Sequence, residues 1–149
     1  RPGRYRADMR LLDWRSRRRR PARVGMAASG VVGADPGGSP IQVAVDGPRV
    51  ELYFLTSSCY GCRALWDAFS ARPRRPTDPA VVVVTPSPET ESSRQVKALA
   101  PAHLPVVMSS EAWHAYAVTQ APWRVVVADG VVVADGVVVA DGPSPAAWP

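Results

Sequence analysis

The chain has few of the residues that build disulfide frameworks or metal sites: of its 149 residues, two are cysteine and two are histidine. One pair of cysteines is too few for a disulfide framework, and a chain of this length can bury enough surface to fold without one. A structural zinc ion needs four ligands, usually in closely spaced pairs, and His103 and His114 are not spaced in this way. The composition therefore disfavours both a disulfide-stapled scaffold and a zinc finger.

Long apolar segments are also lacking. No run approaches the ~18 apolar residues of a membrane-spanning helix, and the arginine-rich start has no apolar region typical of a signal peptide. For the chain as given we therefore expect a cytoplasmic location. The alternative is an extracytoplasmic protein, anchored by a membrane segment that precedes Arg1 in a longer chain.

The net charge of +5 is distributed unevenly, because residues 1–23 contain ten arginines and only two aspartates. Such a like-charge block repels itself and buries no apolar surface. Together with the glycine- and proline-rich segment 33–40, it predicts that residues 1–40 form a disordered basic tail and linker. We expect the tail to contact anionic surfaces and to bind no specific nucleic acid, because no nucleic-acid-binding motif accompanies it.

The remaining sequence alternates between strand and helix patterns. Strands, marked by β-branched and aromatic residues, are predicted at 41–45, 50–56, 80–85 and 105–108. Helices, marked by an apolar face or a capping serine, are predicted at 62–71, 87–99 and 109–118. This order predicts an α/β fold with a partly parallel central sheet, in one domain over residues 41–142.

The hexapeptide VVVADG occurs three times in succession, at 125–130, 131–136 and 137–142. Asp129 and Gly130 suit a two-residue type I′ turn, so the first two copies predict a β-hairpin. The third copy is either a further edge strand or an unpaired extension. Residues 143–149 are too few and too rich in proline for a helix, and we expect them to be disordered.

Cys59 and Cys62 stand between a predicted strand and a predicted helix, in the stretch TSSCYGCRALW. A metal clamp lacks further ligands, and a structural disulfide that closes so small a loop adds little stability by chain entropy. A thiol at a helix start faces unpaired N–H groups and the positive helix end, which favour the thiolate and lower its pKa. The pattern therefore favours a redox pair, in which Cys59 attacks a disulfide and Cys62, deeper in the helix, resolves the mixed disulfide.

At this point the chain resembles the thioredoxin-like superfamily, which combines C-x-x-C with a βαβ pattern. YAVTQAPW at 116–123 is similar to the superfamily's loop that ends in a cis-proline, and Pro122 matches that proline. PVVMSSEAWHAYAV at 105–118 is similar to the TlpA and peroxiredoxin-like branch. The resemblance covers residues 41–136 and implies a thioredoxin-like fold, with a central mixed sheet flanked by helices but without the superfamily's C-terminal helix.

The resemblance implies a monomeric thiol–disulfide oxidoreductase that acts on protein dithiols and disulfides, with no metal or organic cofactor. Cys59 and Cys62 would be catalytic, and the substrate would be held by Tyr60, Gly61, Ala121, Pro122 and Trp123. In the superfamily, the residue before the cis-proline offers backbone hydrogen bonds to the substrate chain, and that residue is Ala121 here.

The chain departs from thioredoxin at two further places. Tyr53 stands where thioredoxin has a buried carboxylate, and Glu51 lies on the same strand face without an assigned role. The dipeptide between the cysteines is Tyr60-Gly61, whereas thioredoxin has Gly-Pro, so the redox potential does not carry over.

Two other functions stay open. One is a non-enzymatic adaptor with the same fold, whose basic tail binds anionic surfaces. The other is a thiol peroxidase, because TSSC at 56–59 is similar to the T-x-x-C of peroxiredoxins, although Leu52 stands where that family has a proline.

Overall fold

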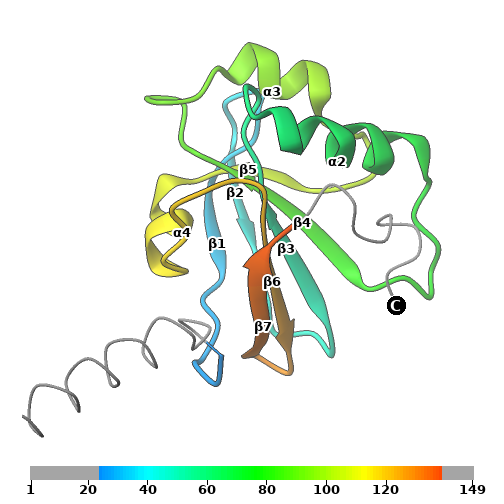
Figure 1. Ribbon diagram of the computed structural model, residues 1–149, viewed down its shortest axis with the longest axis vertical. Helices are drawn as coiled ribbons and strands as arrows, with labels where there is room; N and C mark the ends of the chain where they lie inside the picture. Colours follow the sequence, from blue (N-terminus) through cyan, green and yellow to red (C-terminus); the bar gives the residue numbers. More distant parts are fainter. Residues whose placement is uncertain (1–23, 139–149) are drawn as a thin grey trace, which may run out of the picture.

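The computed structural model describes residues 24–138, which form a single mixed sheet flanked by helices (Figure 1). The strands are β1 (Val31–Ala34), β2 (Pro40–Val43), β3 (Val50–Phe54), β4 (Ala80–Thr85), β5 (Val106–Met108), β6 (Trp123–Ala128) and β7 (Val131–Val137). The helices are α2 (Tyr60–Ala71), α3 (Ser93–Leu99) and α4 (Ser110–Ala115). None of these described helices is both long and apolar enough to cross a bilayer.

The sheet is parallel at its centre and antiparallel toward its edges. Its strand order is β2-β1-β5-β4-β3-β6-β7, and β4 pairs in parallel with both β3 and β5. Parallel neighbours need crossover connections, and α2 and α3 supply them. The predicted α/β fold with a central mixed sheet and flanking helices is therefore confirmed.

The sheet separates two apolar cores because successive strand residues point to opposite faces. On one face Tyr53 and Leu55 pack with the buried side of α2, which includes Trp66. On the other face Phe54 packs with residues of α4. The pleat of β3 thus packs one strand against helices on both faces of the sheet. Burial of each large apolar side chain in these contacts contributes on the order of 1.5–3 kcal/mol to stability.

The repeated hexapeptide forms the predicted hairpin, but its copies differ in conformation. Asp129 and Gly130 have φ values of 50° and 77° and turn the chain between β6 and β7. Asp135 and Gly136, which occupy the same places in the second copy, continue along β7. The third copy starts at Val137, the last residue of β7, and residues 139–142 lie outside the described part, as do residues 143–149.

The structure differs from the predicted linker at residues 24–40, where β1 and β2 form a hairpin at one edge of the sheet. The glycine-rich segment between them is a tight turn, in which Asp35 and Ser39 exchange hydrogen bonds of 2.8 and 2.9 Å. Val31 and Val32 are too short an apolar run to be recognised as a strand without the partner strand β5. The predicted basic tail at residues 1–23 lies outside the described residues.

The start of α3 also differs from the prediction. The helix was predicted to start at residue 87, but the Ser87 hydroxyl accepts a 2.7 Å hydrogen bond from the N–H of Ser110 at the start of α4. Residues 87–91 form a turn, and Ser92 caps α3 by accepting a hydrogen bond of 3.2 Å from the N–H of Gln95. The other predicted helices and the strands after residue 40 are present, some of them shorter by a few residues.

Candidate active site

Cys59 is the N-cap residue of α2, directly after the loop that follows β3. Its Sγ accepts a hydrogen bond of 3.1 Å from the N–H of Cys62, and the two cysteines form a disulfide with a Cα–Cα distance of 5.1 Å. Cys59 is partly exposed, whereas Cys62 is fully buried under the helix. Only the first sulfur of the pair is therefore accessible to another molecule.

The loop before Cys59 is fixed by Thr56 and Trp66. The Thr56 hydroxyl accepts a hydrogen bond of 3.1 Å from the N–H of Cys59. The backbone carbonyl of Thr56 accepts another, also of 3.1 Å, from the indole N–H of Trp66. Thr56 thus orients the backbone at the helix start. Trp66 belongs to the apolar face of the helix predicted at residues 62–71. The position of Trp66, one turn after Cys62 on this helix, did not indicate that its indole N–H would bond to Thr56 before the helix.

A carboxylate from another segment holds the same loop. Glu91 accepts a hydrogen bond of 3.0 Å from the N–H of Ser57, a short one from the Ser57 hydroxyl, and one of 2.9 Å from the N–H of Ser92. The side-chain amide of Gln95 lies 2.9 Å from the Ser57 hydroxyl. This Ser57–Glu91 contact fastens the start of α3 to the residues just before Cys59, and no sequence signal indicated it.

The proline loop lies against the cysteine pair. The Ala121–Pro122 peptide bond is cis, as the resemblance implied. The Sγ of Cys59 is 3.6 Å from the carbonyl oxygen of Ala121. A Cβ atom added to Gly61 would lie 3.3 Å from Cδ of Pro122, so the small residue between the cysteines permits this close approach.

The structure thus brings five of the seven predicted site residues together: Cys59 is bonded to Cys62 and lies 3.6 Å from the carbonyl of Ala121, and Gly61 lies against Pro122. Tyr60 stands at the rim and is 96% exposed. Trp123 packs against the core on the other face of the sheet, in register with Phe54, so its indole is not brought to the cysteines.

The chain matches several solved structures of other proteins. No protein-family model and no curated protein match the chain. A hypothetical protein from Sinorhizobium meliloti matches with a TM-score of 0.63 at 20% identity, over 85% of this chain and 76% of that chain. The exposed lipoprotein thioredoxin of Streptococcus pneumoniae matches with a TM-score of 0.60 at 20% identity, over 74% and 90%. A secreted disulfide oxidoreductase of Mycobacterium tuberculosis, homologous to DsbE, matches with a TM-score of 0.59 at 15% identity, over 74% of this chain and 89% of that chain.

The fold is thioredoxin-like. At these identities the likeness shows the fold alone. The C-x-x-C pair occupies the start of the first helix after a central strand, beside a cis-proline loop.

Polar side chains are also packed on the α2 face of the sheet. Tyr53 donates a hydrogen bond of 3.2 Å to Glu51, whose side chain is nearly fully buried. Arg124 donates to the same oxygen of Glu51 through Nε at 2.8 Å and through its terminal nitrogen. The buried Glu51 carboxylate is therefore paired with the partly exposed Arg124 of β6, and this ion pair gives the carboxylate a structural role.

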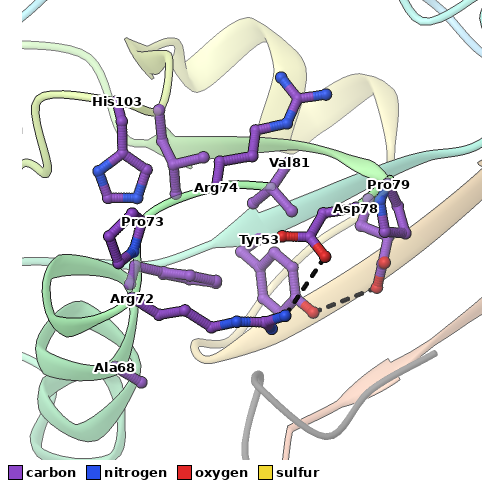
Figure 2. A pocket seen from close by; sticks show the side chains of 12 residues that line it. Tyr53, Ala68, Arg72, Pro73, Arg74, Asp78, Pro79, Val81 and His103 are labelled. Carbon is purple, nitrogen blue, oxygen red and sulfur yellow. Dashed lines mark hydrogen bonds and ion pairs between the residues drawn. The ribbon is translucent and has the colours of Figure 1, made fainter. Parts of the chain in front are cut away.

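The electrostatics of this cluster act on Tyr53. Burial, and then the negative charge of Glu51, raise the pKa of Tyr53 well above its ordinary value of 10.0. A small cavity of about 60 Å³ adjoins the cluster, bordered also by an ion pair of 3.3 Å between Arg72 and Asp78 (Figure 2). The cavity is too small for an organic substrate, since ligand pockets are roughly 300–1,000 Å³. Among residues 24–138 no three His, Cys, Asp or Glu side chains are grouped so as to hold a metal ion.

Proposed function

We propose that the protein is a thiol–disulfide oxidoreductase that acts on protein disulfides through Cys59 and Cys62. The observation that carries the proposal is the accessible sulfur of Cys59 at a helix N-terminus, bonded to buried Cys62 and 3.6 Å from the carbonyl of Ala121. The disulfide oxidoreductase of M. tuberculosis, which shares the fold, adds support of a coarser kind.

In the reductive direction the reaction begins with the reduced pair. The Cys59 thiolate attacks one sulfur of the substrate disulfide, forms a mixed disulfide with it, and releases the other substrate sulfur as a thiolate. The N–H of Cys62, which points at Sγ of Cys59 from 3.1 Å, stabilises the attacking negative charge. The positive end of α2 acts in the same sense.

The second step regenerates the pair in its oxidised form. The Cys62 thiolate attacks Sγ of Cys59, the mixed disulfide breaks, and the second substrate sulfur leaves as a thiolate. Two electrons have then passed from the cysteine pair to the substrate, whose two sulfurs take up protons from solvent. The Cys59–Cys62 disulfide is the product of this step, and the reverse sequence oxidises a substrate dithiol.

Ala121 is suited to hold the substrate chain during both steps. Among the residues that the structure describes, none accepts a hydrogen bond from its N–H, and its carbonyl oxygen faces Cys59. An extended substrate segment can therefore pair with this backbone as an added strand does, with its cysteine next to Sγ. Pro122, buried beside Gly61, keeps this backbone in place.

The test is to trap the mixed disulfide. A Cys62→Ser variant is incubated with oxidised insulin, free thiols are alkylated, and adducts are identified by mass spectrometry. We expect a covalent adduct through Cys59, and insulin reduction by the unmutated chain that is abolished in Cys59→Ala. Insulin reduction that persists in Cys59→Ala, or an adduct-free Cys62→Ser protein, would refute the proposal.

A further inference from the structure

A groove runs along the side of Cys59 that faces α3. It has a volume of about 560 Å³, and neither Ala121 nor Pro122 borders it. Its lining comes from the loop after β3, from α2 and from α3: Ser57, Ser58, Cys59, Tyr60, Arg63, Trp66, Gln95, Ala98 and Leu99. The groove is therefore a surface distinct from the proline loop, and both surfaces meet at the same sulfur.

The groove combines an apolar floor with a positive rim. Trp66, Ala98 and Leu99 supply the apolar part. Arg63 is the single charged residue among the lining residues; its side chain is exposed and forms no ion pair within residues 24–138. Glu91 is not among the lining residues, and its carboxylate accepts hydrogen bonds from the N–H groups of Ser57 and Ser92. The positive end of α2 adds to the charge of Arg63.

We propose that this groove binds the polypeptide segment next to the reactive cysteine of a protein substrate, and that Arg63 selects segments with an acidic residue there. The inference rests on the proposed function and adds the substrate class. Arg63 follows Cys59 by about one helical turn, roughly 6 Å along the axis at 1.5 Å per residue. An extended segment covers that distance in about two residues. The acidic residue therefore belongs about two positions from the substrate cysteine.

The experiment compares two peptide disulfides that are identical except for Asp or Lys two positions from the reactive cysteine. The neutral compound 2-hydroxyethyl disulfide, which is too small to reach Arg63, reports the basal reaction. Second-order rate constants of a single turnover, which needs no external reductant, are measured for the pre-reduced unmutated chain, for Arg63→Glu, and for Arg74→Glu as a control. The control makes the same change of charge at an exposed arginine outside the groove.

We expect the unmutated chain to prefer the Asp peptide by about two- to fivefold, the usual effect of one exposed ion pair. Arg63→Glu reverses the preference and Arg74→Glu keeps it, when the rate of each protein on the two peptides is divided by its own rate on 2-hydroxyethyl disulfide. Equal rates on both peptides, or the same shift in both variants, overturn the inference while leaving the proposed function intact. If none of the reduced proteins reacts with either peptide disulfide, the proposed function is refuted, and with it the inference.

A second pair of variants tests the groove without changing Arg63. Ala98→Trp fills the groove from α3, and Lys97→Trp places the same side chain on α3 outside the lining. We expect Ala98→Trp to slow both peptides by at least fivefold relative to 2-hydroxyethyl disulfide, and Lys97→Trp to slow neither. Equal effects of the two substitutions on the peptides would show that the groove does not bind substrate.

Discussion

The Sγ atom of Cys59 lies 3.6 Å from the carbonyl oxygen of Ala121, although 62 positions separate the two residues in the chain. The strand register explains this proximity. β3 and β6 are antiparallel neighbours, and Phe54 at the end of β3 is paired with Trp123 at the start of β6. The loop after β3 and the loop before β6 therefore lie next to each other at the same end of these two strands, and the candidate active site forms there.

The helix position of Cys59 predicts the pH dependence of its reactivity. In the reduced protein we expect Cys59 to react with iodoacetamide with a midpoint below the ordinary thiol pKa of about 8.5, because α2 and the N–H of Cys62 favour its thiolate. Cys62, which is fully buried, reacts more slowly at every pH. Mass spectrometry of each alkylated peptide between pH 5 and 10 measures both rates, and a Cys59 midpoint at or above about 8.5 contradicts the prediction.

The Ser57–Glu91 contact predicts a loss of stability on substitution. Glu91→Ala leaves the N–H groups of Ser57 and Ser92 without their carboxylate acceptor. Because the contact is only partly buried, we expect the free energy of unfolding to fall by about 1–2 kcal/mol, below the upper range for hydrogen bonds to charged groups. Glu89→Ala, at an exposed glutamate close by in the sequence, is the control and should change stability by less than about 0.5 kcal/mol. Urea unfolding measures the free energy of unfolding of both variants. Equal values for Glu91→Ala and Glu89→Ala would show that the Ser57–Glu91 contact contributes nothing to stability.

The raised pKa of Tyr53 predicts that the folded protein loses stability at alkaline pH. Its pKa is raised in the folded state, mainly by burial, so above about pH 10 the unfolded chain releases this proton while the folded chain keeps it. The unfolded state then binds fewer protons, and the free energy of unfolding falls as pH rises. The contribution is fully present below about pH 10 and is lost progressively above it.

The corresponding variant is Tyr53→Phe, studied by urea unfolding from pH 7 to 11.5. At pH 7 it should be less stable by about 1 kcal/mol, because the hydrogen bond to Glu51 is lost. Above pH 10 its stability should decline less steeply than that of the unmutated chain. Tyr60→Phe, at a side chain that is exposed in the folded state, serves as control. An unchanged alkaline slope in Tyr53→Phe would count against the assignment.

The repeated hexapeptide offers a matched pair of glycines. Gly130 has a φ of 77° in the hairpin turn, whereas Gly136 lies within β7 and has open space where a Cβ atom would lie. Gly130→Ala should lower the free energy of unfolding by about 1–2 kcal/mol, because an L-residue with a side chain is strained at positive φ. Gly136→Ala should be neutral or stabilising by up to about 1 kcal/mol, because it restricts the unfolded chain. Thermal unfolding compares the two, and equal effects would contradict the difference in backbone conformation.

Much of the fold was predictable because its signals are local. The valine-rich strand at 80–85 and the apolar face of residues 62–71 depend only on the spacing of side chains along one element. The capping serine of α4 was found in the same way, since Ser109 accepts a hydrogen bond from the N–H of Ala112. The strand β1 was missed because its two valines become a strand only when β2 and β5 supply the partners.

The candidate site was predictable in part. The cysteine pair and Pro122 were identified from motif and resemblance, but the residues that hold the loop before Cys59 were not. Glu91 carries no local signal for a contact with Ser57, and it stood in a predicted first helical turn. Trp123 was expected at the substrate, yet its register with Phe54 directs it to the opposite face.

By itself, the sequence determined the helix and strand periods, the turn-forming dipeptide Asp129-Gly130, and the position of two thiols at the start of a helix. The tertiary structure decided which of two identical hexapeptides turns and which continues as a strand, and which carboxylate reaches the loop before Cys59. It also decided that Ala121 meets Cys59. The physical reason is that periodicity and capping act within a few residues, whereas pairing register and burial depend on partners far away in the chain.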